Sequence, residues 1–205
     1  GPIAATAYNC LLEDANHISR VVLLGPSHRV ALSGIAIPDY NEFQTPLGNI
    51  ALDMEAVNYI KGLDGVTTNN AAHSMEHSLE VQLPFLQEML GEFQLVPLVV
   101  GQCSAKVVAN VLNHLWGSEE TLIIISSDLS HYHQYAMAQQ LDQETSRKIE
   151  ALDTNIQGEQ ACGCYPINGM LLAAKQHSLT LDILELCNSG DTAGSKDQVV
   201  GYGAY

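Results

Sequence analysis

Basic residues are scarce in this chain of 205 residues. Only 8 lysines and arginines stand against 23 aspartates and glutamates, so the formal net charge is -15. Such a surface repels phosphate backbones and anionic lipid headgroups, and neither nucleic acid nor a membrane is an expected partner. No apolar run approaches the ~20 residues of a membrane span, and no cationic segment followed by an apolar one marks a secretory signal. We therefore expect a cytoplasmic protein.

The cysteines lack the even number and regular spacing of a disulfide framework. Their odd number favours free thiols in a reducing compartment. The five cysteines are Cys10, Cys103, Cys162, Cys164 and Cys187. Charged residues make up only 15% of the chain and apolar residues 46%, which argues for a compact, heavily buried sheet rather than disorder. The length fits a single domain over residues 1–205.

Apolar, β-branched runs alternate with helical patterns along the whole chain. We expect strands at residues 21–24, 31–37, 93–100, 121–125, 179–186 and 198–205, and helices at 53–63, 78–90, 104–116, 136–152 and 166–177. This alternation predicts an α/β fold with a mainly parallel or mixed central sheet and helices on both faces. The uninterrupted apolar run at 121–125 is typical of a strand buried on both faces.

The first residues already follow a helical pattern, with Ile3, Ala7 and Leu11 on one side and no strand before them. In a parallel sheet a strand normally leads into such a helix. We expect the domain to lack its N-terminal strand in this sequence.

Polar, titratable residues follow two of the expected strands. Ser27 and His28 follow the strand at 21–24, and Asp128, His131 and His133 follow the strand at 121–125. In open α/β sheets, ligands bind beyond the carboxyl ends of the strands, and histidine serves there as a metal ligand or proton carrier. The alternative is that some of these histidines only satisfy backbone groups in turns.

Residues 73–77 match the inverted zincin pattern, H-x-x-E-H. On one helix, His73 and His77 would share a face and could bind zinc, with Glu76 as general base. The helical pattern begins only near residue 78, which favours His77 as a cleft residue without this zinc chemistry.

Cys162 and Cys164 precede Tyr165 and Pro166 at an expected helix start. The helix dipole would favour a thiolate there and lower the pKa of the thiol. The alternative is a pair of small core residues, and the spacing alone leaves both open.

Five motifs occur in a fixed order along the chain. They are Gly-Pro-Ser-His at 25–28, Thr-Pro-Leu-Gly at 45–48, Glu-His-Ser-Leu-Glu-Val-Gln-Leu-Pro-Phe at 76–85, Ser-Ser-Asp-Leu-Ser-His at 126–131, and Cys-Gly-Cys-Tyr-Pro-Ile at 162–167. Together they resemble the Memo family, also called AmmeMemoRadiSam system protein B. The resemblance implies a fold similar to that of the class III extradiol dioxygenases, which open catechol rings with non-haem Fe(II).

The resemblance also implies a metal site. His28 corresponds to a ligand histidine and Cys162 to the ligand cysteine, while Asp128, His131 and His77 correspond to polar residues lining the same cleft. The family's other ligand histidine lies in an upstream Pro-His-Ala-Gly-Tyr motif that this sequence does not contain. The implied metal is Fe(II), with Cu or Zn as alternatives that a thiolate suits at least as well, and we expect it to be absent or weakly bound in this chain.

The resemblance favours a metal-dependent oxidoreductase related to the non-haem iron dioxygenases. In this hypothesis His131 or His77 acts as the general acid and base. Asp128 orients a histidine without itself binding the metal. One alternative is a non-catalytic protein that binds a small molecule or peptide in the inherited cleft, and another is a zinc-dependent hydrolase. The resemblance also implies a functional link to radical SAM and AMMECR-type proteins, but it names no substrate.

Overall fold

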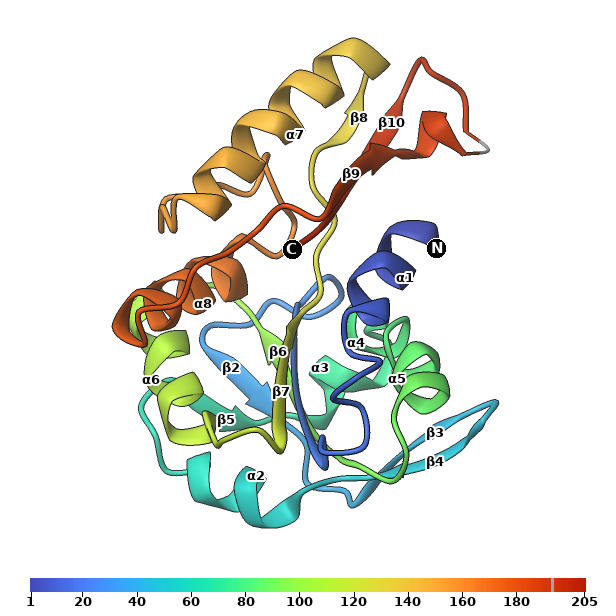
Figure 1. Ribbon diagram of the computed structural model, residues 1–205. Coiled ribbons are helices and arrows are strands. Elements are labelled where there is room, and N and C mark those ends of the chain that lie inside the picture. The colour runs from blue at the N-terminus through green and yellow to red at the C-terminus, as the bar shows by residue number, and fades with distance from the viewer. Residues whose placement is uncertain (193) are drawn as a thin grey trace.

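Five strands form the central sheet of the computed structural model, which describes residues 1–192 and 194–205 (Figure 1). In order across the sheet they are β5 (Val66–Thr68), β2 (Ile35–Ile37), β6 (Gln94–Val100), β1 (Arg20–Pro26) and β7 (Thr121–Ile125). Strands β6, β1 and β7 run parallel to one another, whereas β2 pairs antiparallel with β6. The sheet is therefore mixed, in agreement with the fold class predicted from the sequence.

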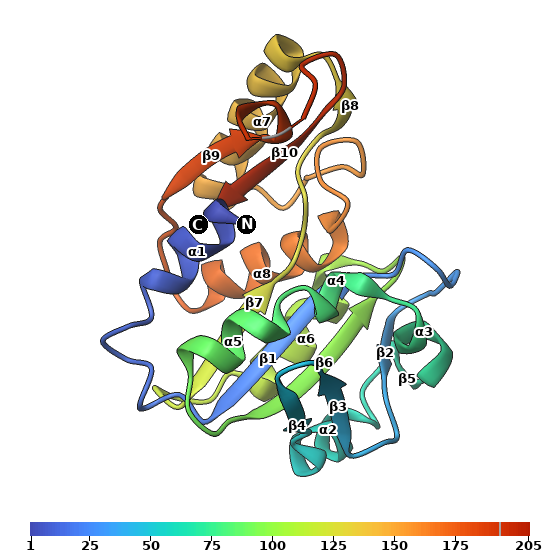
Figure 2. The same ribbon diagram turned by 90° about the vertical axis from the view of Figure 1, so that its right-hand side faces the viewer.

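Two smaller sheets flank this central sheet. One is the hairpin of β3 (Glu42–Thr45) and β4 (Gly48–Ala51). The other is antiparallel, in the order β8 (His131–His133), β10 (Val199–Ala204) and β9 (Glu185–Asn188). The predicted strand at 198–205 is thus confirmed, whereas the one at 179–186 forms only at its end, and both lie outside the central sheet (Figure 2).

Helices cover both faces of the central sheet. The helices of the described residues are α1 (Pro2–Asn9), α2 (Met54–Ile60), α3 (Asn70–Ser74), α4 (His77–Glu80), α5 (Leu83–Met89), α6 (Ala105–Leu115), α7 (Tyr135–Glu150) and α8 (Cys164–Gln176), with a 3-10 turn η1 (Ser189–Asp191). Helices α2, α6 and α8 pack on one face, and α1, α3, α4 and α5 pack on the other. Helix α7 and the turn η1 pack on the sheet of β8, β10 and β9 instead. Over the described residues, no helix has both the length and the apolar character that crossing a membrane requires.

The side chains of β1 show how the sequence produces these two layers. Neighbouring side chains of a strand point to opposite faces of the sheet. Val22 and Leu24 therefore enter the core under α2 and α6, and Val21 and Leu23 enter the core under α4 and α5. All four are fully buried, which explains why residues 21–24 are apolar at every position rather than at alternate ones.

Strand β7 differs from its prediction. Its residues are half-buried throughout, not buried on both faces. The cause is its position at the end of the strand order, where β1 is its only partner among the described strands. Residues Leu122–Ile125 line an apolar groove of about 780 Å³, together with parts of α1 and α8. A run of apolar residues does not reveal whether a strand has one neighbour or two.

The single helix predicted at 78–90 is two helices, α4 and α5. Pro84 lies in the first turn of α5. Proline is tolerated there because it has no backbone N–H to donate and because its ring would clash with the preceding turn inside a helix. The short α4 approaches β1 closely at Gly25, where a Cβ atom would lie 2.6 Å from Ser78 Oγ. Ser78 Oγ also donates to the carbonyl oxygen of Pro26 at 2.9 Å. The start of α4, with Glu76 and His77, is thereby fixed at the carboxyl end of β1.

Candidate functional site

The carboxyl ends of β1 and β7 lie side by side. The backbone N–H of Ser126 donates to the carbonyl oxygen of Leu24 at 2.8 Å, directly after the last paired residues of the two strands. Ser27 and His28 therefore leave the sheet beside Ser127 and Asp128. This is the edge at which α/β sheets bind ligands.

Glu76 lies beneath the histidines at this edge. Its side chain is 1% exposed and precedes α4 as the N-cap, where one carboxylate oxygen accepts the backbone N–H of Ser78 at 3.0 Å. The same oxygen, Oε1, lies 2.8 Å from Nδ1 of His28 and 3.4 Å from Nδ1 of His77. The other oxygen accepts the backbone N–H of His28 at 2.5 Å. One buried carboxylate thus joins the loop after β1 to the start of α4.

These contacts determine the charge of Glu76. Burial raises the pKa of the Glu76 carboxyl, but the hydrogen bonds from His28 and Ser78 together lower it by a larger amount. The resulting pKa is about 2. Glu76 is therefore ionised at neutral pH and can only accept hydrogen bonds. It follows that the Nδ1 atom of His28 carries a proton.

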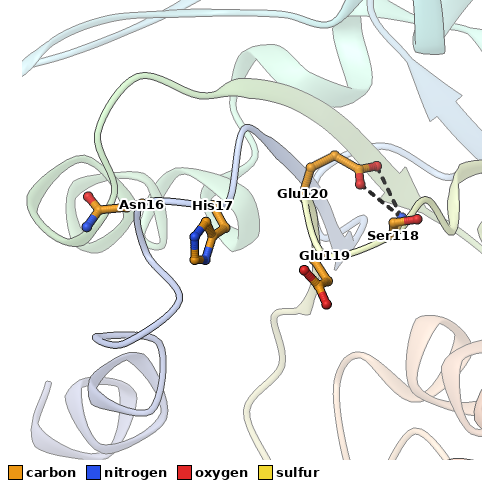
Figure 3. A pocket seen from close by; sticks show the side chains of 5 residues that line it. All are labelled: Asn16, His17, Ser118, Glu119 and Glu120. Carbon is orange, nitrogen blue, oxygen red and sulfur yellow. Dashed lines mark hydrogen bonds between the residues drawn. The ribbon is translucent and has the colours of Figure 1, made fainter.

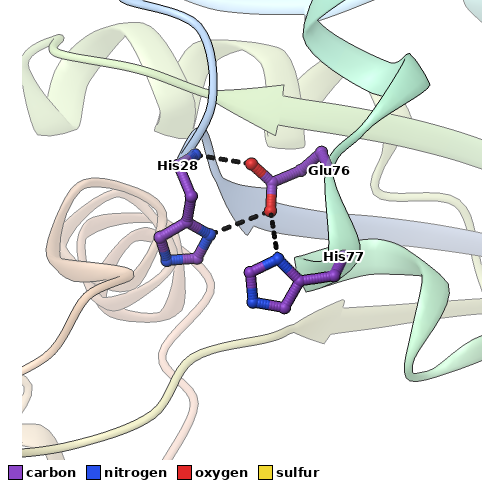
Figure 4. Close-up of side chains that lie close together, drawn as sticks. All are labelled: His28, Glu76 and His77. Atoms are coloured by element: carbon purple, nitrogen blue, oxygen red, sulfur yellow. Dashed lines mark hydrogen bonds and ion pairs between the residues drawn. The ribbon is translucent and has the colours of Figure 1, made fainter.

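The rings of His28 and His77 stack above this carboxylate, with centroids 4.9 Å apart and planes 26° apart. Figure 4 shows the second nitrogen of each ring, Nε2, on the side of the ring away from Glu76. One ligand atom from each of His28, Glu76 and His77 lies within 4.8 Å of the others. Because the Glu76 oxygens already accept three hydrogen bonds, the two imidazoles are the members of this cluster available to a metal.

Asp128 and His131 form the second part of the site. Asp128 Oδ2 lies 3.6 Å from Nε2 of His131, and both side chains are partly exposed. Burial raises the pKa of the Asp128 carboxyl, and the nearby His131, His28 and His77 lower it by a smaller amount, so the net shift is upward. The carboxylate of Asp128 thus lies within electrostatic range of all three histidines.

Cys162 lies against the backbone of Asp128. Its Sγ accepts the N–H of Asp128 at 3.3 Å and is 3.6 Å from Ser127 Oγ. Burial raises the pKa of the Cys162 thiol by more than the hydrogen bonds from Ser127 and Asp128 lower it. Burial likewise raises the pKa of Cys164. Of the two alternatives that the sequence left open for these cysteines, the raised pKa values favour small core residues, because desolvation outweighs the effect of the start of α8.

His73 does not take part in this site. It ends α3, whereas His77 begins α4, and the chain leaves the helical conformation between them. The ring of His73 is buried, with Nε2 3.1 Å from the carbonyl oxygen of Ala36, and it packs against Tyr40 and Phe43. The single helix face that an inverted zincin site needs is absent from this segment, which the structure describes in full.

A shallow pocket lies at the opposite, amino end of β7 (Figure 3). Its lining residues are Asn16, His17, Ser118, Glu119 and Glu120. Both carboxylate oxygens of Glu120 accept the backbone N–H of Ser118 at 3.1 Å. Since Glu120 is occupied by its own turn and none of the sequence-predicted site residues lies here, this pocket is a polar surface hollow.

Asp128 connects the residues that the sequence singled out. Its backbone contacts Cys162, its carboxylate faces His131, and it lies within electrostatic range of His28 and His77. Sequence reasoning missed the buried position of Glu76 under two histidines, and it missed the contact of Ser127 with Cys162. The adjacency of Glu76 and His77 at a helix start was the available signal for the first.

Comparisons with known proteins identify relatives of this chain. The sequence profile of the Memo-like protein family matches residues 1–205. A MEMO1 family protein of Saccharolobus islandicus is 31% identical over 217 residues, covering 98% of this chain and 76% of that protein. A MEMO1 family protein of Sulfolobus acidocaldarius is 32% identical, with the same coverage. The crystal structure of uncharacterized protein JW3007 from Escherichia coli K12 shares the fold, with a TM-score of 0.53 and 14% identity over 96% of this chain and 91% of that one. The chain belongs to the Memo family.

Proposed function

We propose that the chain is a metal-dependent oxidoreductase whose metal is held by His28 and Cys162. The observation that carries the proposal is the meeting of an imidazole, a thiol and a carboxylate at the carboxyl ends of β1 and β7. His28 comes from the loop after β1, Asp128 from the loop after β7, and Cys162 packs on the Asp128 backbone. Three separate segments of the chain therefore converge there.

The donor set fits a transition metal. Nε2 of His28 is free because Nδ1 is bound to Glu76, and a histidine anchored through its other nitrogen to a carboxylate is a common ligand arrangement. The backbone N–H of Asp128 points at the sulfur of Cys162 and would stabilise a thiolate. Imidazole and thiolate together suit Fe, Cu or Zn.

The chain's own residues then have separate tasks. His131 is held by Asp128 at 3.6 Å and moves a proton to or from a hydroxyl group of the bound substrate. Asp128 keeps the His131 ring in place. A bound Fe(II) ion would supply the one-electron chemistry with O₂ that these side chains lack. The acid/base step needs a pKa near the operating pH, for which histidine is suited.

We expect His28→Ala and Cys162→Ser to weaken metal binding by at least about tenfold, since each removes a direct donor. Isothermal titration with Zn²⁺ measures the affinity, and the sulfur-to-cobalt charge-transfer band of the Co²⁺-loaded protein reports the thiolate. Matched controls are His17→Ala and Cys10→Ser, because both side chains are exposed and remote from the cleft. Equal affinities in all five proteins would refute the metal site.

Oxygen uptake tests the reaction class. Protein loaded anaerobically with Fe²⁺ is mixed with a panel of catechols, and O₂ consumption is recorded for the wild type and His131→Ala. We expect turnover in the wild type and a loss of about 100-fold or more in the variant, the range of general acid–base catalysis. Metal binding without any turnover would contradict the oxidoreductase proposal and favour a ligand-binding protein. Turnover of esters or amides without O₂ would indicate a hydrolase.

A further inference from the structure

The Glu76 carboxylate is saturated with donors. A carboxylate offers about four acceptor positions. Two are taken by the backbone N–H groups of His28 and Ser78, and the imidazole nitrogens of His28 and His77 face the others. Because backbone N–H groups can only donate, this environment stabilises the anion and leaves the imidazole nitrogens that face it as donors. Both histidines should therefore be protonated on Nδ1.

This tautomer has a geometric consequence. The unprotonated nitrogen of each ring is Nε2, and both Nε2 atoms lie away from Glu76 (Figure 4). The two rings are nearly parallel and stacked at 4.9 Å, so their lone pairs lead toward the same side of the pair. That side is reached by solvent, since the His28 side chain is 32% exposed and that of His77 is 57% exposed.

We propose that Glu76 holds His28 and His77 as a matched pair of imidazoles and that His77 is a further nitrogen ligand of the metal bound by His28. The ligand role of His77 rests on the metal site proposed above, whereas the tautomer does not. Metal–nitrogen distances near 2.0–2.1 Å place two neighbouring ligand nitrogens roughly 3 Å apart. The rings stack with their centroids 4.9 Å apart, and rotation of the more exposed His77 ring would bring its Nε2 atom toward that of His28. In this role Glu76 is a positioning residue that fixes both rings and raises their basicity.

Asp128 adds to this arrangement. Its carboxylate lies within electrostatic range of both His28 and His77, and it is partly exposed. Its negative charge favours a divalent cation near the two rings. The close cluster itself contains only His28, Glu76 and His77, and Cys162 reaches this edge through its contact with the Asp128 backbone.

Nitrogen-15 NMR of the metal-free protein tests the positioning role directly. Long-range ¹H–¹⁵N spectra distinguish Nδ1–H from Nε2–H imidazoles. We expect His28 and His77 to be Nδ1–H tautomers at pH 7.5, and exposed His17 to show mainly Nε2–H. In Glu76→Gln the amide NH₂ faces the existing donors, so at least one ring should change tautomer. Glu80→Gln, an exposed position on the same helix α4, should leave both unchanged. Nε2–H signals for His28 and His77 in the wild type would overturn the positioning role whether or not the variant folds.

Zinc titration of the same proteins tests the ligand role. We expect His77→Ala and Glu76→Gln each to lower the Zn²⁺ affinity about tenfold or more, with Glu80→Gln and His17→Ala at the wild-type value. If the wild type binds Zn²⁺ and His77→Ala binds it equally well, the ligand role of His77 is wrong and the metal site of His28 and Cys162 stands. If the wild type binds no Zn²⁺, both the ligand role and the metal site fail, and the tautomers decide the positioning role alone.

Discussion

Gly169→Ala should lower the free energy of unfolding by about 3 kcal/mol, the upper range for overpacking a close contact. Gly169 lies in α8 where this helix crosses α6, and a Cβ atom there would be 2.2 Å from Cβ of Val108 and 2.3 Å from its Cγ1. The Cβ atom of Val108 cannot be removed from the contact by side-chain rotation, because it is attached directly to the backbone. The two helices must therefore move apart, and the better helix propensity of alanine, about 1 kcal/mol, offsets only part of the loss.

The same substitution should reach the candidate site. Helix α8 begins at Cys164, two residues after Cys162, so a displaced α8 pulls the thiol away from the Asp128 N–H. Urea denaturation gives the loss of stability, and Zn²⁺ titration gives the accompanying loss of affinity. Gly62→Ala is the matched control, since no atom lies within 4 Å of its added Cβ. A Gly169→Ala protein as stable as this control would show that α6 and α8 do not pack as described.

The alternation of apolar runs and helical patterns was sufficient to predict the layered α/β fold. It worked best where a segment is buried by its neighbours along its whole length, as in β1 and β6. The pattern did not predict the surroundings of strands that are covered on one side and open on the other. The exposed side of β7 and the separate sheet of β8, β9 and β10 both depend on which strands are neighbours, and strand order is not encoded in a local pattern.

The members of the candidate site could be named from the sequence, but not the contacts between them. His28, Asp128 and Cys162 stood out because they follow strands or precede a helix, and the structure places them around one sheet edge. The sequence could not show which histidines contact the Glu76 carboxylate. Those contacts depend on the break between α3 and α4, which the sequence pattern does not reveal. The H-x-x-E-H pattern suggested His73 and His77 as partners, whereas Glu76 meets His77 and His28.

His73 should make the protein less stable in acid, by about 3 kcal/mol between pH 7 and pH 4. Burial lowers the pKa of His73 to about 4, and the contacts with Ala36 and Glu76 only partly oppose this. Its Nδ1 atom is buried without a hydrogen-bond partner among the described residues, so an added proton there would have no acceptor. In the unfolded chain the pKa returns to about 6.5. Between pH 6.5 and pH 4 the unfolded state binds more protons at His73 than the folded state does. The contribution of His73 to the free energy of unfolding is therefore complete above pH 6.5 and decreases as the pH drops toward 4.

The slope of stability against pH isolates this residue from the other titrating groups. Urea denaturation at several pH values between 4 and 7 should give a markedly flatter dependence for His73→Gln than for the wild type, whatever the variant's absolute stability. His17→Gln, which removes an exposed histidine, should keep the wild-type slope. Parallel curves for wild type and His73→Gln would mean that His73 is protonated in the folded state. In that case its ring would be free to leave the core, and its exclusion from the metal site would have to be reconsidered.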